Sequence, residues 1–122
     1  MAANDFKSVS KQNIAIDSGT FSTMYTGLAS KETILLEIDI ANTTVGDITA
    51  SIKLAKNGGD TIFIVKAAPI PAGGTLKAIS GQKVVMEALD VLSVAASAAT
   101  SADALVSFLE DVYYDRHLYW SR

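Results

Sequence analysis

Hydrophobic and polar residues alternate along much of the chain with the two-residue period of a β-strand. The clearest case is residues 33–44, TILLEIDIANTT. Because successive side chains of a strand point to opposite faces, this pattern predicts a half-buried strand with one apolar face. The predicted apolar face holds Ile34, Leu36, Ile38 and Ile40, and the opposite face holds Leu35, Glu37 and Asp39.

Further strands are predicted wherever the same alternation, or a short apolar run, is bounded by turn residues. The predicted segments are residues 12–17, 20–27, 47–56, 61–67, 75–79, 83–89 and 90–97. Ile48, Ala50, Ile52 and Leu54 are predicted to share the apolar face of residues 47–56. Residues 57–60, NGGD, predict a tight hairpin, because asparagine and glycine tolerate the positive φ that such a turn needs. Residues 80–82, SGQ, predict a break between two short strands.

Both prolines of the chain lie in residues 68–74, APIPAGG. Proline has no N–H to donate to a neighbouring strand, so this segment is predicted to be a connection across an end of the sheet. Ile70, between Pro69 and Pro71, is predicted to enter the core.

Residues 101–114, SADALVSFLEDVYY, fit two periods. Leu105, Phe108, Leu109 and Val112 would form the stripe of a helix capped by Ser101, while the alternation through Ala104, Val106 and Phe108 fits a strand. The all-β context favours a strand that ends near Glu110, because a lone helix would need a separate face to pack on.

Short strands separated by turns, without a clear helical pattern between them, predict an all-β antiparallel β-sandwich of the jelly-roll or immunoglobulin type. We expect about eight short strands, with extended N- and C-terminal arms. At 122 residues the chain fits one domain. The predicted organisation is an N-terminal arm (residues 1–11), a sandwich (residues 12–111) and an aromatic C-terminal arm (residues 112–122).

Charge and composition narrow the possible partners. The net charge is −3 and the lysines are scattered, which argues against nucleic-acid binding, because that normally needs a basic patch. The chain has no cysteine, so disulfides and Cys-ligated metals are excluded. No apolar stretch approaches the roughly 20 residues that span a bilayer, and the polar start lacks the apolar core of a signal peptide. We therefore expect a soluble protein made in the cytoplasm, without membrane partners.

The last dozen residues, DVYYDRHLYWSR, differ sharply in composition from the rest. They contain four of the nine aromatic residues, both arginines and the only histidine. Tyrosine, tryptophan and arginine are enriched at interface cores, because each combines a large contact area with a directional polar group. The segment could instead pack on its own domain, but contact with another chain is favoured. The predicted interface residues are Tyr113, Tyr114, Arg116, His117, Tyr119, Trp120 and Arg122.

Candidate catalytic groups are few. His117 is close to a terminus, and no G-x-S-x-G nucleophile motif is present. Asp111, Asp115 and His117 would need a rigid frame to hold a cation, and Glu37 and Asp39 are predicted to face solvent. The sequence therefore predicts no enzymatic activity, cofactor, metal or small-molecule substrate.

Residues 30–111, about two-thirds of the chain, resemble small virion structural proteins of tailed bacteriophages. That family combines a turn of the type hPaGxTh, a run K-h-V-h-E-x-x-D-x-h-x-V-x-A and a final strand vSxLE. The matching residues are Pro71, Ala72, Gly73, Thr75, Lys83, Val85, Glu87, Asp90, Val94, Ala96, Val106, Ser107, Leu109 and Glu110. Leu89 departs from the pattern, because a glycine commonly precedes the aspartate there, and this puts the geometry of that turn in question.

The resemblance implies a non-enzymatic β-sandwich of a virion, assembled with copies of itself and other virion proteins. It implies a place in the neck or head–tail connection, in the tail or fibre-attachment region, or on the capsid surface as a decoration protein. It also favours a strand over a helix at residues 102–110. A carbohydrate- or receptor-binding sandwich is an alternative from another class, but outside the C-terminal arm the chain has one tyrosine, Tyr25, and no tryptophan.

Overall fold

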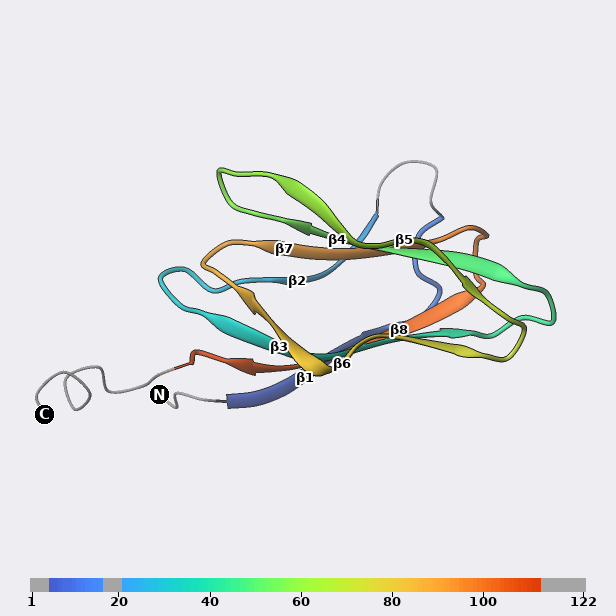
Figure 1. Ribbon diagram of the computed structural model, residues 1–122, viewed down its shortest axis with the longest axis horizontal. Coiled ribbons are helices and arrows are strands. Elements are labelled where there is room, and N and C mark those ends of the chain that lie inside the picture. Colours follow the sequence, from blue (N-terminus) through green and yellow to red (C-terminus); the bar gives the residue numbers. More distant parts are fainter. Residues whose placement is uncertain (1–4, 17–20, 113–122) are drawn as a thin grey trace, which may run out of the picture.

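The computed structural model describes residues 5–16 and 21–112, which form eight strands in two facing antiparallel sheets (Figure 1). In spatial order, the first sheet contains β1 (Asp5–Lys11), β8 (Ala102–Glu110), β3 (Thr33–Asn42) and β6 (Thr75–Met86). The second contains β2 (Ser22–Thr26), β7 (Val91–Ala96), β4 (Ile48–Ala55) and β5 (Thr61–Ile70). The predicted antiparallel β-sandwich is confirmed, and residues 102–110 form a strand.

The order of the strands is that of a jelly roll. Strand β1 pairs with β8, β2 with β7, β3 with β6, and β4 with β5, as in one long hairpin folded over on itself. The β4–β5 hairpin is the closed end of this folded hairpin. Apart from β4–β5, each connection between consecutive described strands passes from one sheet to the other. An immunoglobulin-type sandwich has a different order, so the topology selects between the two predicted types.

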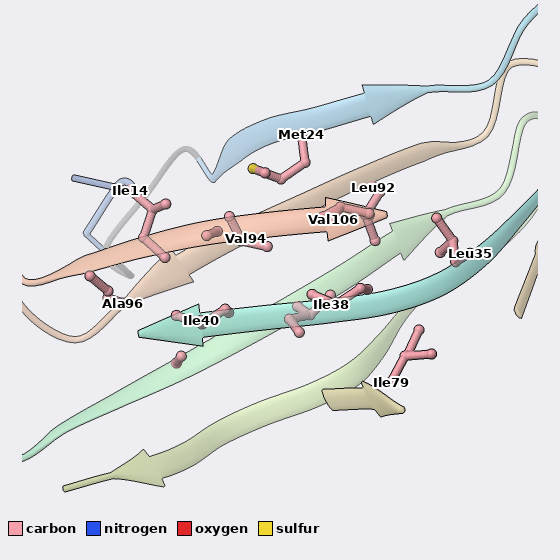
Figure 2. Packing of buried hydrophobic residues seen from close by; sticks show 14 of the residues in the cluster. Ile14, Met24, Leu35, Ile38, Ile40, Ile79, Leu92, Val94, Ala96 and Val106 are labelled. Carbon is pink, nitrogen blue, oxygen red and sulfur yellow. The ribbon is translucent and has the colours of Figure 1, made fainter. Parts of the chain in front are cut away.

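The core lies between the sheets. Ile38 and Val106 of the first sheet and Leu92 and Val94 of the second point into the space between the layers, and all four are fully buried (Figure 2). The predicted apolar face of β4 is buried as expected, as is Ile70 between its two prolines. Burying each such side chain contributes about 1.5–3 kcal/mol to stability, so this layer is the main source of stability of the sandwich.

The predicted apolar face of β3 is correct in one half of the strand and wrong in the other. Ile38 and Ile40 are buried, but it is Leu35, not Ile34 or Leu36, that enters the core. The pairing of β3 shifts between Leu35 and Glu37 against both neighbouring strands. An extra residue at a bulge reverses the faces of all residues beyond it, so Ile34 turns outward.

The N-terminal boundary also differs from the prediction. Residues 5–11, which fall in the predicted arm, form β1, which pairs with β8 from Asp5 opposite Glu110 to Lys11 opposite Ala104. In the described part of the strand predicted at residues 12–17, Ile16 makes only a single bridge to Ala96. Strand β1 lies at the edge of its sheet, where polar side chains are tolerated, so its sequence lacks the apolar alternation of a central strand.

Two predicted breaks lie inside longer strands. Residues 75–79 and 83–89 belong largely to one strand, β6, and the segment SGQ is an irregularity in it, with Gly81 at φ 84°. Pro69, predicted to be in a connection, belongs to β5 opposite Thr49. Strand β5 is at the edge of its sheet and has a neighbour on one side only. A proline is tolerated there, because its missing N–H can face the side that has no neighbouring strand. The connection from β5 to β6 is therefore only residues 71–74.

Candidate protein interface

All seven predicted interface residues lie outside the described residues: Tyr113, Tyr114, Arg116, His117, Tyr119, Trp120 and Arg122. The structure does define where the chain leaves the sandwich. After Glu110, the N–H of Val112 donates a 3.0 Å hydrogen bond to the carbonyl of Glu32, and Lys31 Nζ lies 3.3 Å from Asp111 Oδ1. The chain thus leaves at the end of the first sheet where β1 begins and β8 ends (Figure 1).

Four apolar side chains cross the outer face of the first sheet at this same end. Leu109 is paired with Phe6 on one side and with Ile34 on the other, and Ile34 is paired with Val85. Directly paired residues of antiparallel strands share a face, so the four side chains form one continuous line over all four strands. Phe6 is 77% exposed and Val85 50%, while Ile34 and Leu109 are half-buried. We refer to Phe6, Leu109, Ile34 and Val85 as the apolar row.

The apolar row was not predicted from the sequence. Phe6 falls in the predicted arm, and the bulge in β3 turns Ile34 from the predicted core face to the outer face. Outer faces of antiparallel sheets are normally polar, so an apolar line across four strands is an unusual feature of a free surface. Adjacent strands lie about 4.8 Å apart, so the row is about 14 Å long.

Farther along the same face, charged residues gather on β3 and β6. Lys77 Nζ lies 3.5 Å from both Glu37 Oε2 and Asp39 Oδ1. The hydrogen bond with Asp39 and the nearby Lys77 lower the pKa of Glu37, whereas burial and the neighbouring Glu37 raise the pKa of Asp39. Asp39 also lines a shallow depression with Leu105 and Asp103 of β8.

A polar network lies beneath the apolar row, on the core side of the same strands. The Tyr25 hydroxyl donates to Glu110 Oε2 at 2.6 Å and lies 3.1 Å from Thr33 Oγ1, while Lys7 Nζ lies 2.8 Å from Glu110 Oε1. Burial and the Glu110 carboxylate raise the pKa of Tyr25 to about 12. Hydrogen bonds from Lys7 and then Tyr25 lower the pKa of Glu110, although burial acts against them.

Alternation of apolar residues does not predict this network. Glu110 was expected only to end a strand, yet it occupies a core-facing position in the alternation of β8 and is almost fully buried. A charged residue at such a position requires a partner, because an unpaired buried charge is strongly destabilising. That signal in the sequence could have pointed to Glu110.

A second polar network joins the β4–β5 turn to the turn between β6 and β7. The buried Asp90 carboxylate accepts hydrogen bonds from the N–H groups of Asn57 and Glu87 and from Lys56 Nζ. Burial alone would raise the pKa of Asp90, but the contacts from Lys56 and the two amides outweigh burial, and the pKa is lowered. Leu89 just before it has φ 64°, in the left-handed region that glycine adopts most readily.

The outer face of the second sheet carries a different patch, made of two phenylalanines and two lysines. Phe21 and Phe63 meet edge to face, with ring centroids 6.4 Å apart. Lys53 Nζ lies 4.0 Å from the Phe21 ring centroid, and Lys66 Nζ lies 5.1 Å from that of Phe63. We refer to Phe21, Phe63, Lys53 and Lys66 as the aromatic–lysine patch. The two outer faces of the sandwich thus differ in chemistry.

Within the described residues, no group of three or more histidine and acidic side chains is placed to hold a metal ion. Asp115 and His117, considered with Asp111 as a cation site, are outside those residues. The same described ranges contain no helix long and apolar enough to cross a membrane.

No protein-family model matches the chain, and no curated protein matches it. Among solved structures, the chain is similar to one chain of the structure of the infectious bursal disease virus Gt strain. The two are 16% identical with a TM-score of 0.26, and the match covers 93% of this chain. It spans 41% of that viral chain.

Proposed function

We propose that this chain is a non-enzymatic structural protein of a tailed-phage virion, which assembles through subunit contacts in the neck or in the tail and fibre-attachment region. The observation that carries the proposal is the apolar row, which lies where the Tyr/Trp/Arg-rich C-terminal segment leaves the sandwich. The resemblance of residues 30–111 to small virion proteins of tailed phages supports the same function.

The exposed apolar row is expected to be buried against a partner and not to remain in contact with water. Burying apolar surface contributes about 25 cal/mol per Å², and a side chain as large and exposed as Phe6 offers much of its area to a partner. Aromatic side chains at the centre of an interface commonly dominate its binding energy. The network of Tyr25, Glu110, Thr33 and Lys7 beneath the row ties together three of the strands that carry it, β1, β8 and β3.

Two chemically different faces suit assembly into a ring. A ring built by rotation requires head-to-tail contacts, in which one surface of each subunit meets a different surface of the next. The apolar row on the first sheet and the aromatic–lysine patch on the second lie on opposite sides of the sandwich and differ in chemistry, so each can face a different neighbour. The proposed partners are therefore further copies of this chain and other virion proteins.

Mass spectrometry and cryo-electron microscopy of purified particles of the phage that encodes the chain would test this proposal. We expect the chain in the mature particle, in a symmetric ring of about a dozen copies at the neck or tail. Its absence from purified particles would contradict the proposal. Hundreds of copies on the capsid would instead support the alternative of a decoration protein, and specific binding on a glycan array would support a carbohydrate-binding sandwich.

A further inference from the structure

We propose that the apolar row is the docking site for the C-terminal segment, residues 113–122, of a second copy of this chain. This inference rests on the proposed assembly function and names the two surfaces that meet. The row consists of Phe6, Leu109, Ile34 and Val85 on the outer face of the first sheet.

The chemistry of the two surfaces is complementary. Residues 113–122 contain three tyrosines, a leucine and the only tryptophan, which match an apolar line of aliphatic and aromatic side chains. The segment also contains both arginines of the chain. On the same outer face, Asp39 and Asp103 line the depression beside Leu105, together with Lys11, and carry carboxylates that arginine can bind. Asp39 also lies 3.5 Å from Lys77 Nζ, and Asp103 Oδ1 accepts a hydrogen bond from the N–H of Asn13.

The reach of the segment is sufficient. Ten residues span up to about 33 Å when extended, more than twice the roughly 14 Å length of the row. The remaining length covers the distance of about 13 Å along β8 from Leu109 to Leu105, at about 3.3 Å per residue. One extended segment can therefore contact both the row and the depression with its two aspartates.

The direction of the chain favours a second copy over the chain's own row. Val112 continues alongside Glu32, past the end of the sheet, and its N–H is bonded to the Glu32 carbonyl. To lie on its own row, the chain would have to reverse direction within residues 113–122. Residues 113–122 contain neither glycine nor proline, the residues most suited to tight reversals.

Photo-cross-linking of the full-length chain with isotope mixing tests this inference. The photoreactive amino acid p-benzoylphenylalanine replaces Tyr119, and equal amounts of unlabelled and ¹⁵N-labelled protein are mixed before irradiation. We expect cross-linked pairs of one light and one heavy peptide, in which the acceptor peptide carries Phe6, Ile34, Val85 or Leu109. The double substitution Phe6→Ser and Val85→Thr should lower the yield of these mixed pairs at least tenfold, because it removes the two most exposed anchors.

Val45→Ser is the matched control, because Val45 is fully exposed on the β3–β4 connection and is not part of the row. It should leave the yield of mixed pairs unchanged. Thermal unfolding of each variant verifies that the sandwich is intact. The substituted row residues are half exposed or more, so their effect on folding should be small.

Other results would overturn the inference. Pairs at the row that are exclusively of a single isotope would show that each segment covers its own sheet, and mixed pairs at the aromatic–lysine patch would place the docking site elsewhere. The absence of mixed pairs up to about 1 mM protein would mean that copies do not bind measurably through this contact. None of these results would remove the chain from purified particles, so the proposed function is tested separately.

Discussion

The Tyr25 hydroxyl donates a 2.6 Å hydrogen bond to the Glu110 carboxylate and thereby joins the two sheets of the sandwich. Tyr25 lies on β2 of the second sheet, and Glu110 is the last residue of β8 in the first. The Tyr25 ring also packs on Phe108, with centroids 4.3 Å apart. The pair therefore fixes the end of β8 at the point where the C-terminal segment begins.

Tyr25→Phe should lower the free energy of unfolding by about 1.5–3 kcal/mol, the usual contribution of a hydrogen bond to a charged group. The substitution keeps the ring on Phe108 and removes only the hydroxyl that contacts Glu110 and Thr33. Urea unfolding followed by circular dichroism measures the change. Ser8→Ala, which removes a hydroxyl from an exposed position of β1, should change stability by less than about 0.5 kcal/mol. Equal stability of Tyr25→Phe and the parent would contradict a stabilising role for this bond.

Glu110 should also make stability depend on pH in the acid range. Hydrogen bonds from Lys7 and Tyr25 lower its pKa in the folded chain, whereas the unfolded value is about 4.3. The unfolded state therefore binds the proton more readily. The contribution of Glu110 is present above about pH 4.3 and is lost as the pH falls through the lower folded value.

Urea midpoints between pH 7 and pH 3 test this dependence by comparing the parent chain with Glu110→Gln. The variant cannot titrate at this position, so its stability should fall less steeply between pH 5 and pH 3. Parallel pH profiles of the two proteins would show that the Glu110 carboxyl has the same pKa in the folded and unfolded chains.

Gly27→Ala should destabilise the sandwich by about 1–3 kcal/mol, because it overpacks a close contact between two backbone segments. A Cβ at this position would lie 2.6 Å from the Glu87 carbonyl oxygen, where Gly27 also exchanges hydrogen bonds with Leu89 and Asp90. Gly46→Ala is the matched control, because a Cβ added there would meet no atom within 4 Å. Thermal unfolding of both variants measures the difference, and similar losses in the two would rule out this steric explanation.

Ser51→Ala should lower stability by about 1–3 kcal/mol, because it leaves a backbone N–H of an edge strand without its hydrogen bond. The buried Ser51 hydroxyl accepts a 2.9 Å hydrogen bond from the N–H of Ala67, which has φ 51° where the pairing of β5 with β4 is irregular. Hydrogen exchange of the Ala67 amide should accelerate in the variant. Ser93→Ala on neighbouring β7 should leave that exchange rate unchanged, and slow exchange in Ser51→Ala would mean that another group protects the amide.

The alternation of side chains was enough to predict the sandwich class and most of the strands, but not β1. Alternation correctly placed the apolar face of β4, because local periodicity reports which side chains face a core. The burial of Ile70 was predicted from its place between two prolines, and the strand at residues 102–110 from the all-β context, because periodicity there also fitted a helix. The seven candidate interface residues near the C-terminus remain predictions, since they lie outside the described residues.

The strand partners, the bulge after Leu35 and the edge strand β1 depend on residues far apart in the chain, which local periodicity does not report. Leu109 lies next to Phe6 and Ile34 because β8 is inserted between β1 and β3. The same insertion places Glu110 within reach of Lys7 and Tyr25. The apolar row and the buried network below it are consequently products of strand pairing, since their members come from distant segments that only long-range contacts bring together.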